Sequence, residues 1–251
     1  AANVRDAAPA MLAAMLIFLL AFVIISLTKI PEPHIETAEQ RAAAKSQKSK
    51  YSPLSFRHFV LGAVAIYFYV GVEVGIPNTA NLYMSANPAV GPAIAGTVVG
   101  LYWLMMMFGR LLGGAIGGKV SSKAMLVAVS SLAIAMLVCV MFFPETWVVT
   151  FKGIELPVSM ILMFLCGLMT SVMWGAIFNL AAEGLGKYTP AASGIFMALV
   201  CGGGILPFFQ NLLADHTNYL ISYIVPIAGL LYILFYALVG SKNVNKDIPT
   251  E

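Results

Sequence analysis

Seven long apolar runs, separated by shorter polar segments, dominate the pattern of hydrophobic and polar positions along this 251-residue chain. Each run is close to the roughly 20 residues that an α-helix needs to cross about 30 Å of hydrocarbon. The pattern therefore predicts an all-α, polytopic membrane protein with about seven transmembrane helices, over residues 9–28, 55–76, 93–112, 123–143, 157–180, 191–213 and 218–239.

Composition agrees with this prediction, because the chain is 60% hydrophobic and 10% charged, whereas a soluble domain averages about 45–50% and 25%. The net charge of +3 comes from the loops, and no basic stripe interleaved with aromatic residues indicates nucleic-acid binding. We therefore expect membrane lipid, and not nucleic acid, among its partners. The chain also lacks a phosphate-binding Gly-Lys-Ser/Thr loop, a His-Glu-x-x-His motif and a nucleophile elbow. We expect no enzymatic activity, no catalytic residue, no metal and no cofactor.

Basic residues fall almost entirely on one side of a membrane that is crossed in this way. Of the 14 Lys and Arg residues, 12 lie in alternate connections or after the last span, and only Arg5 and Lys152 lie on the opposite side. Because positively charged loops remain in the cytoplasm, we expect the N-terminus of this chain outside and its C-terminus in the cytoplasm.

The polar segment 29–54 is rich in Glu, Ala, Lys, Ser and Gln, and prolines border it at both ends. Such a composition cannot bury a core and is typical of a solvated linker. The chain opens on Ala-Ala-Asn-Val-Arg, without Met or a signal-peptide pattern, so we expect the C-terminal part of a longer membrane protein. We accordingly predict the last helix of an N-terminal bundle, a cytoplasmic linker, a six-helix bundle and a cytoplasmic tail, over residues 1–28, 29–54, 55–240 and 241–251.

Glu73 is the only acidic residue well inside a predicted span. An ionised carboxylate at mid-depth would cost about 2.5–3.5 kcal/mol on insertion scales, so it should face the bundle interior or a water-filled cavity. Glu73 is therefore either a substrate or proton ligand, or a carboxylate near the outer end of its span that is tied to a neighbouring helix.

Pro77 predicts an interruption beside Glu73, because proline removes a backbone donor and disfavours helix at the preceding residue. Asn78 and Asn81 would then supply amide donors and acceptors at the broken end. Interrupted helices are common at transporter binding sites. The alternative is an ordinary helix end that is capped by asparagine.

The sixth predicted span contains three consecutive glycines, which let another backbone approach closely, and Pro207, which can kink the helix. Gln210 and Asn211 follow about one turn later, and their amides should face inward because they would be costly against lipid.

In the third span, Trp103 offers an aromatic face to a ligand, and Arg110 lies near the cytoplasmic end of the run, some turns away from Glu73. An arginine at that depth can extend to the membrane surface or pair with a carboxylate. We expect the conformational switch to involve Arg110, Gly203 and Pro207, and we expect the substrate to be bound by Glu73, Asn78, Asn81, Trp103, Gln210 and Asn211.

Three segments resemble the major facilitator superfamily, and within it the sugar:proton symporters related to fucose permease and the bacterial glucose/galactose transporters. They are residues 69–77 with the intramembrane glutamate, residues 109–114 (Gly-Arg-Leu-Leu-Gly-Gly), and residues 184–189 (Gly-Leu-Gly-Lys-Tyr-Thr), which continue to Gly203, Gly204, Pro207 and residues 213–215. The resemblance implies that the chain comprises the sixth to twelfth helices of a twelve-helix fold.

The same resemblance implies a function. It is secondary transport of a monosaccharide of the fucose, glucose or galactose type across a bacterial inner membrane, by alternating access and with the proton as coupling ion. The absent N-terminal helices of the same protein would then be a partner of this chain. Two alternatives stay open: a facilitator of another small solute or drug, and a seven-helix receptor, whose topology also places the N-terminus outside.

The charge pattern generates a prediction about orientation. A cysteine introduced at Ser46, in the basic linker, should be protected from a membrane-impermeant thiol reagent in intact cells because that linker is cytoplasmic. A cysteine at Lys152, in a connection on the opposite side, is the control and should be labelled. Rapid labelling at residue 46 from outside would overturn the whole topology.

Overall fold

The structure, a computed structural model, describes residues 8–28, 51–88, 90–144, 146–151, 154–245 and 247–250. The chain forms two units, residues 1–50 and 51–251. In the first unit, α1 (Ala8–Leu27) is a 20-residue helix that is almost entirely apolar, and it coincides with the predicted span 9–28. Most of the linker predicted over 29–54 lies outside the described residues, so it stays a prediction.

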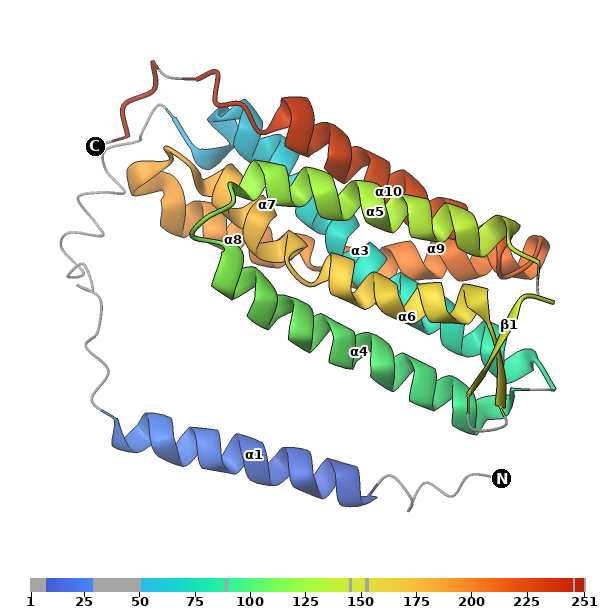
Figure 1. Ribbon diagram of the computed structural model, residues 1–251. Helices are drawn as coiled ribbons and strands as arrows, with labels where there is room; N and C mark the ends of the chain where they lie inside the picture. The colour runs from blue at the N-terminus through green and yellow to red at the C-terminus, as the bar shows by residue number, and fades with distance from the viewer. Residues whose placement is uncertain are drawn as a thin grey trace. The chain divides into compact units, whose positions relative to one another are not determined.

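The second unit is a bundle in which successive membrane-spanning segments run antiparallel (Figure 1). Six segments of the described chain are long and apolar enough to cross a membrane, because α6 with α7, and α8 with α9, each make up one segment. Together with the apolar α1 they confirm the predicted membrane architecture. The helices of this unit are α3 (Arg57–Ala86), α4 (Gly91–Ile116), α5 (Ser122–Phe142), α6 (Val158–Thr170), α7 (Met173–Ala182), α8 (Thr189–Leu199), α9 (Gly202–His216) and α10 (Ile224–Phe235), which continues as a π-helical turn, Tyr236–Gly240.

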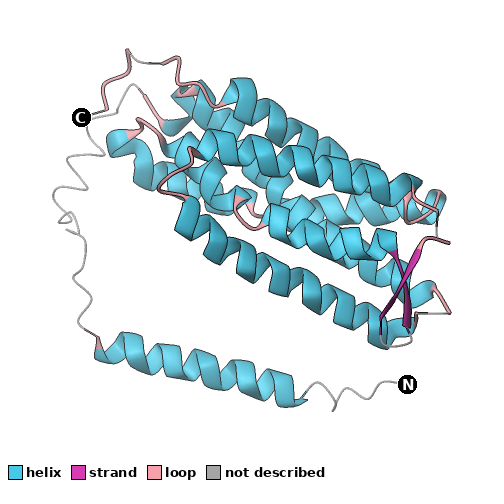
Figure 2. Cartoon of the chain, viewed as in Figure 1, coloured by secondary structure: helices cyan, strands magenta, loops and turns pink. Residues whose placement is uncertain are grey.

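A short β-hairpin, which the sequence did not lead us to expect, connects α5 to α6 at one end of the bundle (Figure 2). Its strands are β1 (Val148–Phe151) and β2 (Ile154–Pro157), and they pair antiparallel with Val148 opposite Pro157. The first strand consists of β-branched and aromatic residues, which favour extended backbone.

The central element of the bundle is α3, which contacts α4, α6, α7, α8, α9 and α10. Its buried positions occur on every side of the helix, as expected of a helix that is apolar all round and enclosed by others. Side chains that project from α3 therefore meet other helices, and polar groups on it need partners from those helices.

The interruption predicted at Pro77 is wrong, because α3 continues without a break through this residue to Ala86. Proline at this position cannot donate to the carbonyl of Glu73, four residues earlier. That carbonyl instead accepts a hydrogen bond from the Tyr102 hydroxyl at 3.0 Å. The helix therefore stays intact where its internal ladder lacks one bond, because α4 supplies the missing donor.

Unlike α3, two spans are interrupted. One break separates α6 from α7 at Ser171 and Val172, where no interruption was expected. The other separates α8 from α9 at Val200 and Cys201, ahead of the three glycines and well before Pro207. At the second break the amides bond three residues back, at 3.4 Å for both Val200 and Cys201, so the turn is locally tightened.

Glycines permit the closest helix contacts around α3 and α4. A Cβ atom on Gly202 of α9 would overlap the carbonyl of Tyr67 on α3, and one on Gly167 of α6 would overlap the carbonyl of Tyr102 on α4. By contrast, a Cβ atom on Gly204 would have nothing within 4 Å. The same run of glycines therefore contains one position where backbone meets backbone and one that is open.

The tail predicted over 241–251 folds back on the end of the bundle at which α3 begins. The side-chain oxygen of Asn245 accepts a hydrogen bond from the Arg57 amide at 2.9 Å. The carbonyl of Thr250 accepts one from the Lys187 amide, in the turn that precedes α8, at 3.0 Å. The tail therefore joins the start of α3 to the start of α8.

The contact at Gly202 generates a prediction about stability. Gly202→Ala should destabilise the protein by about 1–3 kcal/mol, because the α3 backbone cannot move aside without repacking. Gly204→Ala is the matched control and should be neutral or stabilising by about 0.5–1 kcal/mol, since alanine favours helix over glycine. Thermal unfolding of the purified full-length protein in detergent measures both changes, and equal effects of the two substitutions would contradict the close approach of α9 to α3.

Candidate functional site

The candidate functional site is centred on an ion pair between two membrane-spanning helices. Nη2 of Arg110 on α4 lies 3.0 Å from Oε1 of Glu73 on α3, and the side chains are 58% and 13% exposed respectively. A carboxylate with so little exposure needs such a partner to remain ionised within an apolar bundle. The pair thus accounts for the placement of an acidic residue inside a span.

The expectation that Arg110 lies some turns away from Glu73 is therefore wrong. The apolar run was predicted to end at residue 112, which put Arg110 at its border, but α4 continues to Ile116. Arg110 consequently lies roughly 9 Å inside the helix end, at 1.5 Å per residue. Its long side chain covers the remaining distance to Glu73.

Aromatic groups adjoin the ion pair. The Tyr69 hydroxyl, one turn before Glu73, interacts electrostatically with both charges but makes no hydrogen bond of good geometry with any described residue. The Trp174 ring on α7 meets the Tyr69 ring edge-on, with centroids 6.1 Å apart. The site therefore combines two opposite charges with an aromatic wall and a buried hydroxyl that interacts with both charges.

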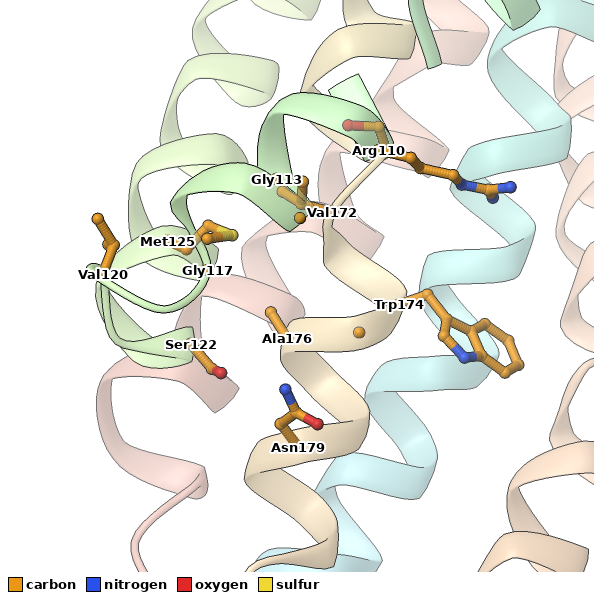
Figure 3. A pocket seen from close by; sticks show the side chains of 13 residues that line it. Arg110, Gly113, Gly117, Val120, Ser122, Met125, Val172, Trp174, Ala176 and Asn179 are labelled. Atoms are coloured by element: carbon orange, nitrogen blue, oxygen red, sulfur yellow. The ribbon is translucent and has the colours of Figure 1, made fainter. Parts of the chain in front are cut away.

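A cavity of about 550 Å³ opens beside this group, between the end of α4, the start of α5 and α7. In Figure 3 the side chains of Arg110 and Trp174 extend toward α3, whereas Ser122 and Asn179 point into the gap between α5 and α7. The volume falls within the range of about 300–1,000 Å³ typical of small-molecule sites. The cavity is lined by Arg110, Gly113, Gly114, Gly117, Val120, Ser122, Met125, Ser171, Val172, Trp174, Gly175, Ala176 and Asn179.

Four residues expected at the site lie instead where α9 packs on α3. Gln210 is buried against Gly75 with only 1% exposed, and its Nε2 has no hydrogen-bond partner among the described residues. The side-chain oxygen of Asn211 accepts a hydrogen bond from Thr79 at 3.1 Å. The other two are Gly203, which packs against Val70, and Pro207, which is buried near Gly75.

Three further candidates have other surroundings. Asn78 is exposed and projects roughly 140° around α3 from Glu73, at about 100° per residue. The Asn81 oxygen accepts a hydrogen bond from Ser85 of its own helix at 3.0 Å. Trp103 is 44% exposed and meets the ring of Tyr102 edge-on. Of the described residues expected to bind substrate or to switch, Glu73 and Arg110 are bonded to each other.

Sequence reasoning left Tyr69, Trp174 and Asn179 out of the expected site. Tyr69 precedes Glu73 by four residues, so the helix period places the two on one face. The other two are an aromatic and an amide in a span that is otherwise apolar, and this contrast is the signal that could have identified them. The participation of Tyr102 has only an indirect signal, which is that a proline inside a helix leaves one carbonyl in need of a donor.

The unequal burial of the two charges generates a prediction. Arg110→Gln should lower stability by about 1–2 kcal/mol, less than the ~3–5 kcal/mol for breaking a fully buried pair, because it leaves the less exposed Glu73 unpaired. Glu73→Gln should cost less, since the more exposed guanidinium can be hydrated. The double variant removes both charges and should be more stable than Arg110→Gln alone.

Thermal unfolding of the purified protein at neutral pH measures these differences, with Lys119→Gln in the exposed turn after α4 as the control for loss of one positive charge. If the double variant lost the sum of the two single effects, the charges would not be coupled.

Similar proteins belong to one family of transporters. Residues 7–208 match the Major Facilitator Superfamily. The chain is 31% identical over 246 residues to a glucose/galactose transporter of Brucella abortus biovar 1 (strain 9-941), covering 96% of this chain and 56% of that protein. It is 29% identical over 230 residues to a putative glucose/galactose transporter of Helicobacter pylori (strain J99), covering 90% of this chain and 52% of that protein.

Solved structures share the fold. The crystal structure of the E. coli fucose:proton symporter matches with a TM-score of 0.73 and 22% identity, over 94% of this chain and 55% of that chain. A second structure of the same transporter, in the outward conformation, matches with a TM-score of 0.71 and 21% identity over the same shares. The chain spans about half the length of the relatives it matches, which are transporters and not enzymes. The alternative of a seven-helix receptor is excluded, because this chain belongs to the Major Facilitator Superfamily.

Proposed function

We propose that this chain is the C-terminal part of a transporter that moves a monosaccharide of the glucose, galactose or fucose type across the membrane. The observation that carries the proposal is the Glu73–Arg110 pair beside a cavity of about 550 Å³ within the membrane-spanning helices. The names of the relatives from Brucella and Helicobacter support the class of substrate.

The chemistry of the cavity suits a sugar. Each sugar hydroxyl is both a donor and an acceptor, so the Arg110 guanidinium, which lines the cavity, can donate to it. The Asn179 amide can do both, and Trp174 presents an aromatic face that can cover the apolar side of the ring. In this proposal Trp174 has the role that the sequence suggested for Trp103.

The ion pair also provides a means of coupling transport to protons. Protonation of Glu73 removes the negative charge that holds Arg110, so the bond between α3 and α4 at this point would weaken when a proton binds. In a transporter with two six-helix bundles, such a change would favour the rocking motion that exposes the site to alternate sides. The absent N-terminal helices would form the opposite wall.

The proposal includes a location and an orientation. Relatives from two bacteria and the basic connections favour the bacterial inner membrane, with the N-terminus of this chain outside and the C-terminus in the cytoplasm. The end of the bundle that holds the tail would then face the cytoplasm.

The test uses the full-length transporter in membrane vesicles with radiolabelled glucose, galactose and fucose. Glu73→Gln keeps the shape of the side chain and removes its charge, so accumulation driven by a proton gradient should fail while counterflow exchange continues. Asp215→Asn, an exposed carboxylate on α9, is the matched control and should leave both activities intact. Equal loss of accumulation and exchange would assign sugar binding alone to Glu73.

Binding tests the cavity itself. Asn179→Ala should weaken equilibrium binding of the transported sugar by roughly two- to tenfold, the effect of one lost hydrogen bond of about 0.5–1.5 kcal/mol. Failure of all three sugars to bind or to be transported by the parent protein would contradict the proposal and favour a facilitator of another small solute or drug.

A further inference from the structure

Glu73 carries a second group that needs a partner, its backbone carbonyl. In a regular helix this carbonyl would accept the amide of residue 77, but residue 77 is proline and has no amide hydrogen. An unsatisfied carbonyl is costly within the membrane, where water is absent. The carbonyl that lacks an amide partner therefore belongs to Glu73, whose carboxylate forms the ion pair.

Tyr102 supplies the missing donor. Its hydroxyl oxygen lies 3.0 Å from the Glu73 carbonyl oxygen, and its side chain is only 1% exposed. The same hydroxyl is hydrogen-bonded to Thr170 of α6 at 3.1 Å. Gly167 of α6 lets the Tyr102 backbone approach closely, because any Cβ atom there would overlap the Tyr102 carbonyl.

One helix thus holds Glu73 at two points. From α4, Tyr102 binds the backbone carbonyl of Glu73, and Arg110, two turns later, binds its carboxylate. Loss of the Tyr102 hydrogen bond would free the α3 backbone at Glu73, and the carboxylate of the same residue must meet Arg110.

We propose that Tyr102 is a positioning residue of the transport site, whose hydroxyl replaces the amide that residue 77 lacks and so fixes the Glu73 carboxylate relative to Arg110. The hydrogen bond stands independently of any function, whereas its effect on transport rests on the function proposed above for Glu73.

The chain contains a matched control. Tyr223 is also fully buried, and its hydroxyl donates to the carbonyl of Ile76, also on α3, at 3.1 Å. That carbonyl lies four residues before Ala80, which has an amide to offer it within the continuous helix. The Tyr223 hydroxyl is therefore an additional donor, and the Tyr102 hydroxyl is a replacement.

The experiment is a double-mutant cycle in the full-length transporter. Tyr102→Phe and Tyr223→Phe are each made with proline at residue 77 and with Pro77→Ala, which restores the amide. Pro77→Gly provides a second background that restores the amide and keeps the helix flexible. Thermal unfolding in detergent and equilibrium binding of radiolabelled glucose, galactose and fucose are measured for every protein.

We expect Tyr102→Phe to lower the melting temperature, and to weaken binding of the transported sugar by roughly two- to tenfold, when residue 77 is proline. In either restored background the same substitution should change binding less than twofold, because the amide now serves the carbonyl. Tyr223→Phe should have the same effect in all backgrounds.

An equal loss from Tyr102→Phe in all backgrounds, or no loss beside proline, overturns the proposal. Rescue of stability without rescue of sugar binding overturns the positioning role, since a purely structural contact would behave in that way. If the parent protein binds none of the sugars, the proposed substrate class has failed, and the melting temperatures alone still decide whether Tyr102 replaces the missing amide.

Discussion

Inside the bundle, a charge or a carbonyl without a partner is too costly to keep, and this constraint acts most strongly at Glu73. The residue carries a carboxylate that is mostly buried and a carbonyl that Pro77 leaves without an amide. Both needs are met from α4, by Arg110 and Tyr102. The relative position of α3 and α4 is therefore set in part by polar contacts, in a bundle whose core is mainly apolar.

The break between α6 and α7 has a related role. Gly109 and Gly113 of α4 face Ser171 and Val172 so closely that a Cβ atom on either glycine would overlap the facing side chain. The break thus lies where α4 presses on its neighbour, and it separates the half that supports Tyr102 from the half that carries Trp174. The tight packing of Ser171 and Val172 on these glycines therefore fixes where one half ends and the other begins.

The sequence was sufficient for the architecture and much less so for the site. Apolar runs predict membrane spans because length and hydropathy alone determine whether a helix can cross. The pairing of Glu73 with Arg110 depends on where α4 ends, and residues 113–116 include two glycines that made the end look nearer than it is. Pro77 suggested a break because it removes a backbone donor. The prediction was wrong because local sequence cannot show that another helix supplies a replacement, as Tyr102 does. Gln210 was expected at the cavity because an amide is costly against lipid and should point into the bundle. That argument does not say whether the amide faces a cavity or packs against another helix, and Gln210 packs against α3.

The hydrogen bonds of the tail affect the order in which the protein can be completed. Thr250 and Asn245 bind Lys187 and Arg57, which belong to segments made much earlier. During synthesis at about 5–20 residues per second, domains fold as they emerge, so these two contacts can form only after all the helices of the bundle have been made. Until the tail has been made, the Arg57 and Lys187 amides at the starts of α3 and α8 lack the partners that the mature protein provides.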